Sequence, residues 1–312
     1  MKKKIRILLF AASFACAALL AYLFLWGKLF PFSPVAIGFT RHELSHMIVF
    51  VEEGAGFNDF ARLDALVPEV EHFHELRFMH KPKLYIFRDK ASYARRSVSK
   101  ARFCTFPNGN IVISPWALQE DKEGKISLEI YLKHELSHSL LFQNAEIWTA
   151  YKYPNWLLEG IAVYSANQLG TSWYPSKKET YALIKQGNFM PPKYYKTRKE
   201  DGVRLDVPYR MAFIYSEFGC IVGYLIESFG RDRFLRYMKR LCKTSDHEGV
   251  FNDTFGLSFD TFIDQFKERV SSLSIPNQKD SEVSTEDIIK KECPTSRSSR
   301  PRRADAAAEL VR

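Results

Sequence analysis

One short motif restricts the fold of this chain more than any other feature of its sequence. In the segment His134-Glu135-Leu136-Ser137-His138, two histidines lie four residues apart. Residues at this spacing lie on one face of an α-helix, one turn apart. Both imidazoles can then bind a single metal ion at about 2.0–2.1 Å. The opposite side of the predicted helix, over residues 127–142, carries leucines that can pack against a core: Leu132, Leu136 and Leu140.

A carboxylate that can complete the metal site follows on a second predicted helix, over residues 155–167. Glu159 lies twenty-one positions after His138. Two histidines and one glutamate leave a fourth position open for water, which is the ligand pattern of catalytic zinc sites. We therefore predict one Zn²⁺ per chain, bound by these three residues. Gly160 and Ala162 are small, so we expect them to let this helix approach the histidine helix closely.

Glu135 has a different predicted role from the two histidines. At 3.6 residues per turn it lies about 100° around the helix from His134, beside the metal-binding face. A carboxylate in that place can take a proton from a water molecule at the open position. Glu135 is therefore the predicted general base of a hydrolytic zinc site. The alternative is a buried helix whose histidines only satisfy local hydrogen bonds.

The two motifs together resemble those of a known group of enzymes. His134-Glu135-x-x-His138 followed by Trp156-Leu-Leu-Glu159-Gly-Ile-Ala resembles the gluzincins, the clan of thermolysin and the membrane-alanyl aminopeptidases. The strongest similarity is to the compact peptidase-MA-like domains of bacterial membrane and secreted proteins. It extends over roughly residues 45–270.

The resemblance implies both a fold and an activity. The fold is α+β and zincin-like, with a mixed sheet above a cleft, active-site helices below it and a helical C-terminal part. The activity is the hydrolysis of peptide bonds in peptide or protein substrates, with Glu135 as the base. In such enzymes the strand nearest the cleft pairs with the extended substrate, and residues 110–114 are the candidate by position.

Tyr215 is a second candidate catalytic residue by the same resemblance. In the aminopeptidase branch, a tyrosine donates a hydrogen bond to the oxyanion of the tetrahedral intermediate. A further tyrosine and a leucine follow it nine and ten positions later, as Tyr224 and Leu225 do here. Tyr209 is the alternative register. The chain has no Gly-x-Met-Glu-Asn sequence, with which the aminopeptidases hold a free amino group, and this favours an endopeptidase.

The pentapeptide His-Glu-Leu-Ser-His occurs a second time, at residues 42–46. A strand-like run, Met47–Val51, follows it directly, so a helix long enough to align His42 and His46 is not expected. The Trp-Leu-x-Glu-Gly sequence that follows the first motif has no counterpart here. We therefore predict no metal at this copy.

The N-terminal segment indicates where the chain is located. Residues 7–26 are apolar and uncharged, and about 20 helical residues span the ~30 Å core of a bilayer. Four basic residues precede this run, whereas Lys28 alone follows it closely. The asymmetry predicts a single-pass protein of the cell membrane, with a cytoplasmic N-terminus and an extracytoplasmic catalytic domain. The run is longer than the core of a typical signal peptide, which favours an uncleaved anchor over a cleaved signal.

The remaining patterns divide the chain into an anchor (1–30), a linker (31–44), a peptidase domain (45–275) and a disordered basic tail (276–312). Strands are expected at 47–51 and 83–87, and a hairpin at 103–114 around the Asn108-Gly109 turn. Helices are expected at 58–76, with Pro68 as a possible break, and at 211–229, 232–242 and 259–270. Strands early and helices late indicate an α+β domain.

Composition excludes some functions and leaves others open. Part of the net charge of +9 lies at the two ends of the chain, and no nucleic-acid-binding motif accompanies it. We therefore expect no nucleic-acid partner. The five cysteines do not have the spacing of a disulfide framework. A non-catalytic binding or assembly module of the cell envelope on a zincin scaffold stays open as the alternative function. A structural zinc site is disfavoured, because such sites rely on cysteine.

Overall fold

The computed structural model describes residues 2–273 of the chain, so the expected tail lies outside the described residues. One five-stranded mixed sheet has the strand order β1-β2-β3-β5-β4. β2, β3 and β5 run parallel, and each outer strand pairs antiparallel with its neighbour. The strands are β1 (Phe39–Glu43), β2 (Ile48–Glu52), β3 (Lys83–Ile86), β4 (Phe103–Thr105) and β5 (Ile111–Ile113).

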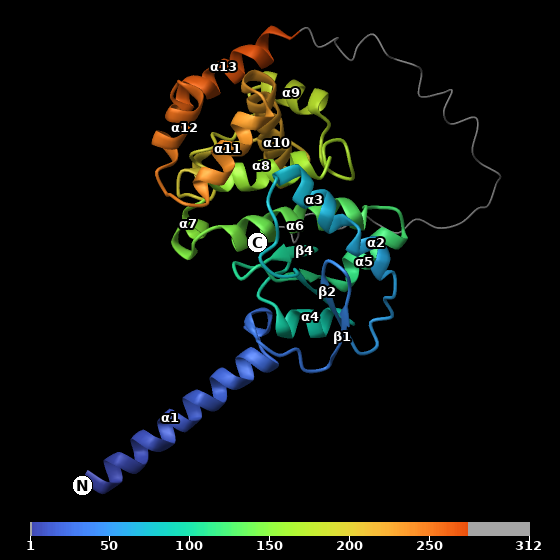
Figure 1. Cartoon of the computed structure of the whole chain (residues 1–312), viewed down its shortest axis with the longest axis vertical. Coiled ribbons are helices and arrows are strands. Elements are labelled where there is room, and N and C mark those ends of the chain that lie inside the picture. The colour runs from blue at the N-terminus through green and yellow to red at the C-terminus, as the bar shows by residue number, and fades with distance from the viewer. Residues whose placement is uncertain (1, 274–312) are drawn as a thin grey trace, which may run out of the picture.

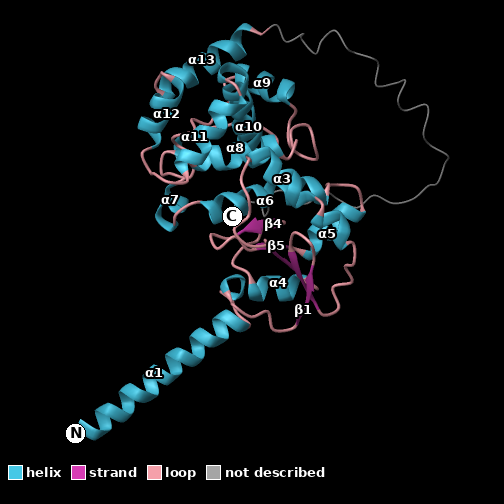
Figure 2. Ribbon diagram, in the orientation of Figure 1, coloured by secondary structure: helices cyan, strands magenta, loops and turns pink. Residues whose placement is uncertain are grey.

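Helices make up most of the rest, and Figure 1 shows the sheet region between the N-terminal helix and the helical C-terminal part. The helices up to the last strand are α1 (Lys2–Leu25), α2 (Phe60–Asp64), α3 (Leu66–His74) and α4 (Lys90–Arg96). After the sheet come α5 (Pro115–Lys122), α6 (Leu128–Asn144), α7 (Ile147–Lys152), α8 (Asn155–Ser165), α9 (Lys177–Lys185), α10 (Arg210–Phe229), α11 (Arg231–Leu241), α12 (His247–Phe255) and α13 (Phe259–Ser272). All described strands precede residue 114, and Figure 2 shows them grouped in one region apart from the C-terminal helices, which confirms the α+β class.

Most predicted elements are confirmed within a few residues. Ser127 caps α6 by accepting a hydrogen bond from the backbone N–H of Ile130 at 3.3 Å. The β4–β5 hairpin turns at Gly109, whose φ of +78° is a conformation that glycine adopts without strain. The sequence analysis did not predict the shorter helices α4, α5, α7, α9 and α12.

Two of the predicted boundaries are wrong. Residues 31–44, expected to form a linker, contain β1, which pairs with β2 along its whole length. The break in the helical region 58–76 lies at Ala65, ahead of Pro68. Pro68 belongs to the first turn of α3, where backbone N–H groups have no partner within the helix and a proline removes no bond.

The helix α6 joins two apolar clusters. Leu132, Leu136 and Leu140 are fully buried in a cluster with the strand residues Ile86 and Ile113. On its other side α6 contacts α8, which packs in turn along α10 in the C-terminal cluster. The residues of the predicted site on α6 and α8 are therefore held between a sheet and a helical layer.

Gly160 does not act as predicted. A Cβ atom at Gly160 would lie 2.6 Å from the carbonyl oxygen of Phe218, which belongs to α10. Gly160 therefore permits close approach of α8 to α10 rather than to α6. The reason is its position, because the residue after Glu159 lies about 100° around the helix and faces away from the histidines.

The helix α1 extends from the domain, and its residues Lys4–Leu25 have a mean hydropathy of 2.4 and none of the window is buried. It is long and apolar enough to span a membrane, and a signal sequence has the same properties. α10 also meets the length and hydropathy criteria, but 67% of its window is buried. We therefore assign α10 to the core.

Candidate metal centre

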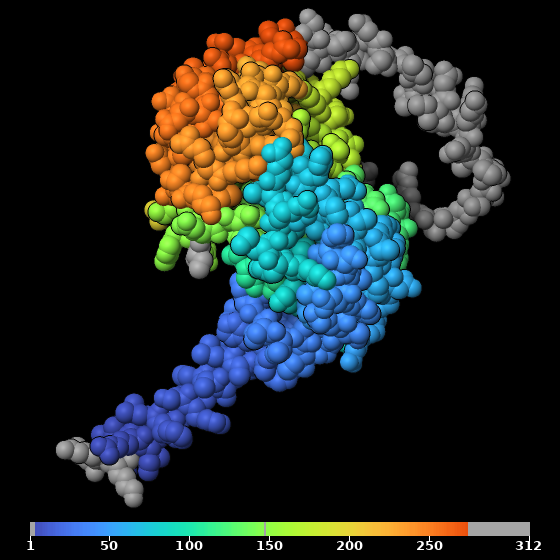
Figure 3. All heavy atoms as spheres, viewed as in Figure 1, coloured from blue at the N-terminus to red at the C-terminus, as the bar shows by residue number. Residues whose placement is uncertain are grey.

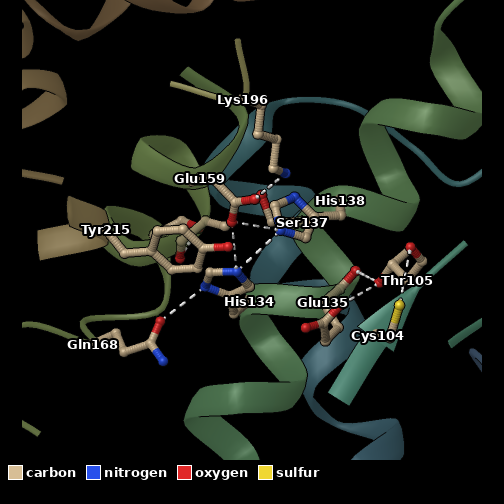
Figure 4. A network of polar contacts seen from close by, with 12 residues as sticks. Cys104, Thr105, His134, Glu135, Ser137, His138, Glu159, Gln168, Lys196 and Tyr215 are labelled. Carbon is tan, nitrogen blue, oxygen red and sulfur yellow. Dashed lines mark hydrogen bonds and ion pairs between the residues drawn. The ribbon is translucent and has the colours of Figure 1, made fainter. Parts of the chain in front are cut away.

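The structure brings His134, His138 and Glu159 together. The two histidines lie on one face of α6, and Glu159 reaches them from α8 (Figure 4). All three are buried. Among the described residues, this trio is the one set of His, Cys, Asp or Glu side chains close enough to share a metal ion.

The distances within this trio fit a tetrahedral ion. Ligands placed tetrahedrally at about 2.0–2.1 Å from zinc lie about 3.3–3.4 Å from one another. Glu159 Oε2 lies 3.4 Å from His134 Nε2 and 3.3 Å from His138 Nε2. The two Nε2 atoms are 3.0 Å apart. The donor set and its spacing are therefore suitable for a metal ion.

Gln168 fixes the orientation of His134. Its Oε1 lies 2.8 Å from His134 Nδ1, and the Gln168 side chain is fully buried. An amide oxygen only accepts, so Nδ1 carries the proton and Nε2 presents its lone pair to the site. A histidine ligand is commonly held in this way by a partner on its other ring nitrogen.

Glu159 is ionised in its buried position. Burial alone would raise its pKa, but His138, His134 and Lys196 outweigh burial and lower that pKa well below its usual value. Burial likewise opposes protonation of His134, but hydrogen bonding to Glu159 and the charge of Glu135 raise its pKa. The trio therefore combines an anionic oxygen with two ring nitrogens, the charge pattern that a divalent cation requires.

Lys196 contacts the carboxylate oxygen that the histidines leave free. Its Nζ lies 3.2 Å from Glu159 Oε1, whereas Oε2 faces both Nε2 atoms. The lysine side chain is 47% exposed, so its ammonium group stands between the buried ligands and solvent. Its backbone adopts a φ of +57°, which is uncommon for a residue with a Cβ.

Glu135 lies beside the metal trio and is held by β4. Thr105 Oγ1 lies 2.6 Å from Glu135 Oε2 and 2.9 Å from the carbonyl oxygen of the same residue. A threonine hydroxyl that donates to the carboxylate keeps it in one rotamer while leaving Oε1 free of protein partners among the described residues. Glu135 thus lies outside the metal-binding trio, with one carboxylate oxygen bound by Thr105.

Tyr215 also reaches the site, and Figure 4 shows its hydroxyl pointing toward the trio. Its ring stacks on that of His134 with centroids 6.1 Å apart. Tyr195 donates a hydrogen bond of 3.2 Å to the Tyr215 hydroxyl oxygen. Burial raises the pKa of Tyr215 well above its usual value, so the hydroxyl stays protonated and can donate. Tyr209 is 56% exposed just before α10.

A second layer of polar contacts supports α6 from the opposite side. Ser137, between the two histidines, forms a 2.8 Å hydrogen bond with His74 Nε2, and His74 Nδ1 bonds the carbonyl oxygen of Val70 at the same distance. Both side chains are fully buried. Burial lowers the pKa of His74 to about 4, so this histidine is neutral and serves to fix α3 against α6.

The second His-Glu-Leu-Ser-His copy has the predicted non-helical conformation. His42 and Glu43 belong to β1, and Ser45 and His46 form the turn to β2. His42 stacks on Phe60 at 4.4 Å, and Glu43 pairs with Arg41 at 2.6 Å. His42 therefore packs against an aromatic ring, and neither imidazole belongs to the metal-binding group found among the described residues.

Residues 110–114 are not an available edge for a substrate, contrary to the prediction. β5 is paired on both sides, with β3 and with β4. β4 is the outer strand, and it is β4 that contacts α6 and holds Glu135. The prediction chose the wrong strand of the hairpin: the first strand, β4, lies at the edge of the sheet, and the second, β5, lies inside it.

Several residues of the site were missed by the sequence analysis: Thr105, Gln168, Tyr195 and Lys196. They come from a strand end and from loops, where no helical spacing links them to the motif. In comparisons with other proteins, neither the models of known families nor the curated sequences match this chain. The function is therefore argued from the site itself.

Proposed function

We propose that this protein is a membrane-anchored zinc peptidase of the gluzincin type. The observation that carries the proposal is the His134–His138–Glu159 trio, whose ligand atoms are 3.0–3.4 Å apart. Beside it lies the carboxylate of Glu135, which is not one of the three ligands. Glu135 has its own partner, Thr105, and lies next to the trio on α6. This separation of ligands from base is typical of hydrolytic zinc sites and has no use in a structural one.

The side chains divide the reaction between them. Zinc, when bound, would lower the pKa of a water molecule and polarise the substrate carbonyl. Glu135 would take the proton of the attacking water and later give it to the leaving amine. Tyr215, as a protonated phenol near the trio, would donate a hydrogen bond to the developing oxyanion. Lys196 would hold Glu159 Oε1 and so leave Oε2 directed to the metal.

A substrate strand has a suitable place at β4. This strand is the outer strand of the sheet and ends at Thr105, which contacts Glu135. An extended peptide that pairs with an exposed edge gains main-chain hydrogen bonds and is laid along the strand. Pairing here would bring a peptide bond past Glu135 and the trio. An internal peptide segment suits this arrangement, in keeping with an endopeptidase.

The proposed location rests on α1 and its flanking charges. Basic residues before the apolar helix favour a cytoplasmic N-terminus. The catalytic domain would then lie outside the cytoplasm, joined to the membrane by a single helix.

Metal analysis and a cleavage screen test the proposal together. The full chain, purified in detergent, should hold one zinc per chain, and His138→Ala should lose it on dialysis. Glu135→Gln should keep zinc and stability but lose cleavage of a peptide library by about 10²–10⁴-fold. Zinc in wild type without any cleavage would favour a non-catalytic module. One equivalent of zinc retained by His138→Ala would show that the site is assigned wrongly.

A further inference from the structure

The segment that follows the anchor helix, residues 26–37, is packed tightly onto the domain. We call it the juxtamembrane segment. Phe30 is fully buried, with ring centroids 5.5 Å from Tyr85 and 6.1 Å from Phe87. The carbonyl oxygen of Pro31 accepts hydrogen bonds from the side-chain amides of Asn108 and Asn110, at 2.9 and 2.7 Å. The segment is therefore part of the folded domain and not a flexible tether.

Two basic residues add further attachments. Lys28 Nζ donates to the carbonyl oxygens of Ala94 and Ser97 at the C-terminal end of α4, where a helix favours a cation. Arg96 donates to the carbonyl oxygen of Ile37 at 2.7 Å, and its guanidinium lies 5.0 Å from the centroid of the Phe30 ring. Together these contacts fix the segment at both of its ends.

Apart from Lys28, the side chains that the segment turns outward are apolar. Their exposed fractions are 39% for Trp26, 37% for Phe32, 50% for Val35 and 39% for Ile37. Figure 3 shows the early residues, in blue, forming the surface of the domain around the base of α1. Exposed apolar side chains gathered in one place mark a contact with a membrane or a partner. Tryptophan and other aromatic residues are also enriched where a protein meets the membrane–water interface.

We propose that the juxtamembrane segment lies on the bilayer that α1 enters and holds the catalytic domain against it. This inference rests on the proposed membrane anchorage. The exposed apolar side chains of the segment would contact the headgroup and upper acyl region of that same bilayer, because Trp26 directly follows the end of α1 at Leu25. A segment that is rigidly attached, apolar on its outer side and continuous with a spanning helix cannot leave the interface without moving the whole domain.

The segment is also close to the catalytic machinery. Phe32 packs edge-on against Phe106, with centroids 5.3 Å apart. Phe106 follows Thr105, which holds Glu135. On the next turn, Ser139 of α6 donates a 2.7 Å hydrogen bond to the carbonyl oxygen of Gly109. The side chains of Phe106 and Thr105 thus lie between Phe32 and the proposed base Glu135, so the metal trio lies near the bilayer. The substrate class this favours is a polypeptide segment held close to the membrane surface.

Lipid contact can be measured directly on the full chain in nanodiscs. An environment-sensitive NBD label would be attached at Val35→Cys and, as a control, at Ser271→Cys, which is exposed on α13 at the far end of the molecule in Figure 1. Cys16 and Cys293 would be replaced by alanine beforehand. Cys104 can stay, because burial raises the pKa of its thiol to about 12 and thiols react as thiolates.

Lipids spin-labelled near the headgroup should quench the label at position 35 by about half, because interfacial side chains lie roughly 5–10 Å deep. They should leave the label at position 271 unchanged. Ile37→Asp, added to the Val35→Cys protein, should reduce the quenching. Zinc content and thermal stability should stay the same, because the hydrogen bond from Arg96 goes to the backbone of Ile37 and not to its side chain. Absence of quenching at position 35 would overturn the proposal. An apolar environment there without quenching would also overturn it, by indicating a protein partner or a second copy.

A pair of substrates separates this inference from the proposed function. One peptide sequence would be presented in solution and on a lipid anchor in the same vesicles. Wild type should favour the anchored form, and Ile37→Asp should lose that preference while it still cleaves the soluble peptide. Equal preference in both proteins would refute the inferred substrate class. Failure to cleave either peptide, with lipid quenching intact, would refute the peptidase proposal alone.

Discussion

Replacing Gly160 with alanine should loosen the contact that positions Glu159. The added Cβ would lie 2.6 Å from the carbonyl oxygen of Phe218 and 2.9 Å from Val222 Cγ2. That oxygen belongs to the backbone of α10 and cannot rotate away, so α8 and α10 must move apart by several tenths of an ångström. Since Gly160 follows Glu159 directly, the movement shifts a proposed metal ligand as well as the core.

Two effects of opposite sign set the size of the change. Alanine is favoured over glycine within a helix by ~1 kcal/mol. Overpacking of a tight interior typically costs ~1–3 kcal/mol and occasionally more. A contact with fixed backbone belongs at the upper end of that range, which leaves a net loss of ~1–2 kcal/mol in the free energy of unfolding. For a domain of this size the melting temperature should then fall by roughly 2–8 °C.

Urea unfolding, thermal unfolding and zinc titration against a chelator would measure the effect. Gly223→Ala is the matched control at the same α8–α10 contact, where the added Cβ would lie 3.0 Å from the Tyr164 ring. A half-buried ring can turn aside, so this variant should stay within ~0.5 kcal/mol of wild type or gain stability. We expect Gly160→Ala alone to weaken zinc binding, by ~10–100-fold, as when a supporting contact of a ligand is lost. Equal stability and equal zinc affinity in the two variants would refute the reasoning.

Three further predictions follow from the site. Gln168→Leu removes the acceptor for the His134 Nδ1 proton and should lower zinc affinity by ~10–100-fold; unchanged affinity in a competition titration would count against this role. Tyr215→Phe should keep zinc content but lower turnover by ~10²–10³-fold, and normal turnover would exclude Tyr215 as an oxyanion donor. His74 has a pKa of about 4 in the folded protein and an ordinary value of 6.5, so its contribution to stability is present above pH 6.5 and is lost as the pH falls toward 4. In chelator-treated protein, His74→Leu should therefore flatten the dependence of the unfolding free energy on pH in that window, and a slope equal to that of wild type would contradict it.

The sequence predicted the parts of the fold that have a regular period. The helices of the metal ligands and the Asn-Gly hairpin follow from local spacing and turn chemistry, and the structure has them close to the expected residues. The meeting of Glu159 with the two histidines is also in the structure, because α6 and α8 pack against each other and lie close together in the chain, with the short helix α7 between them. These features depend on neighbours within the chain, which a sequence displays directly.

What the sequence could not supply is the identity of the partner across each contact. The small size of Gly160 indicated a close helix neighbour but not that the neighbour is α10 rather than α6. The run Ile111-Val112-Ile113 could have been recognised as interior, since continuous apolar residues are typical of a strand buried on both faces. Thr105 is a polar residue at the end of the outer strand β4, and its hydroxyl could have been considered as a partner for Glu135. Lys196 lies in a loop, where no regular spacing of residues could link it to the site.

In the proposed peptidase, the length of β4 limits what main-chain pairing could contribute to the choice of substrate. β4 has three residues, and in an antiparallel ladder alternate residues direct their N–H and C=O groups outward. Such an edge offers about four hydrogen bonds at ~0.5–1.5 kcal/mol each. These bonds are the same for every peptide sequence, so they supply affinity without discrimination. Selectivity in the proposed peptidase would then come from side chains near the metal trio. Lys196, whose side chain is 47% exposed, would favour peptides with a negative charge beside the scissile bond.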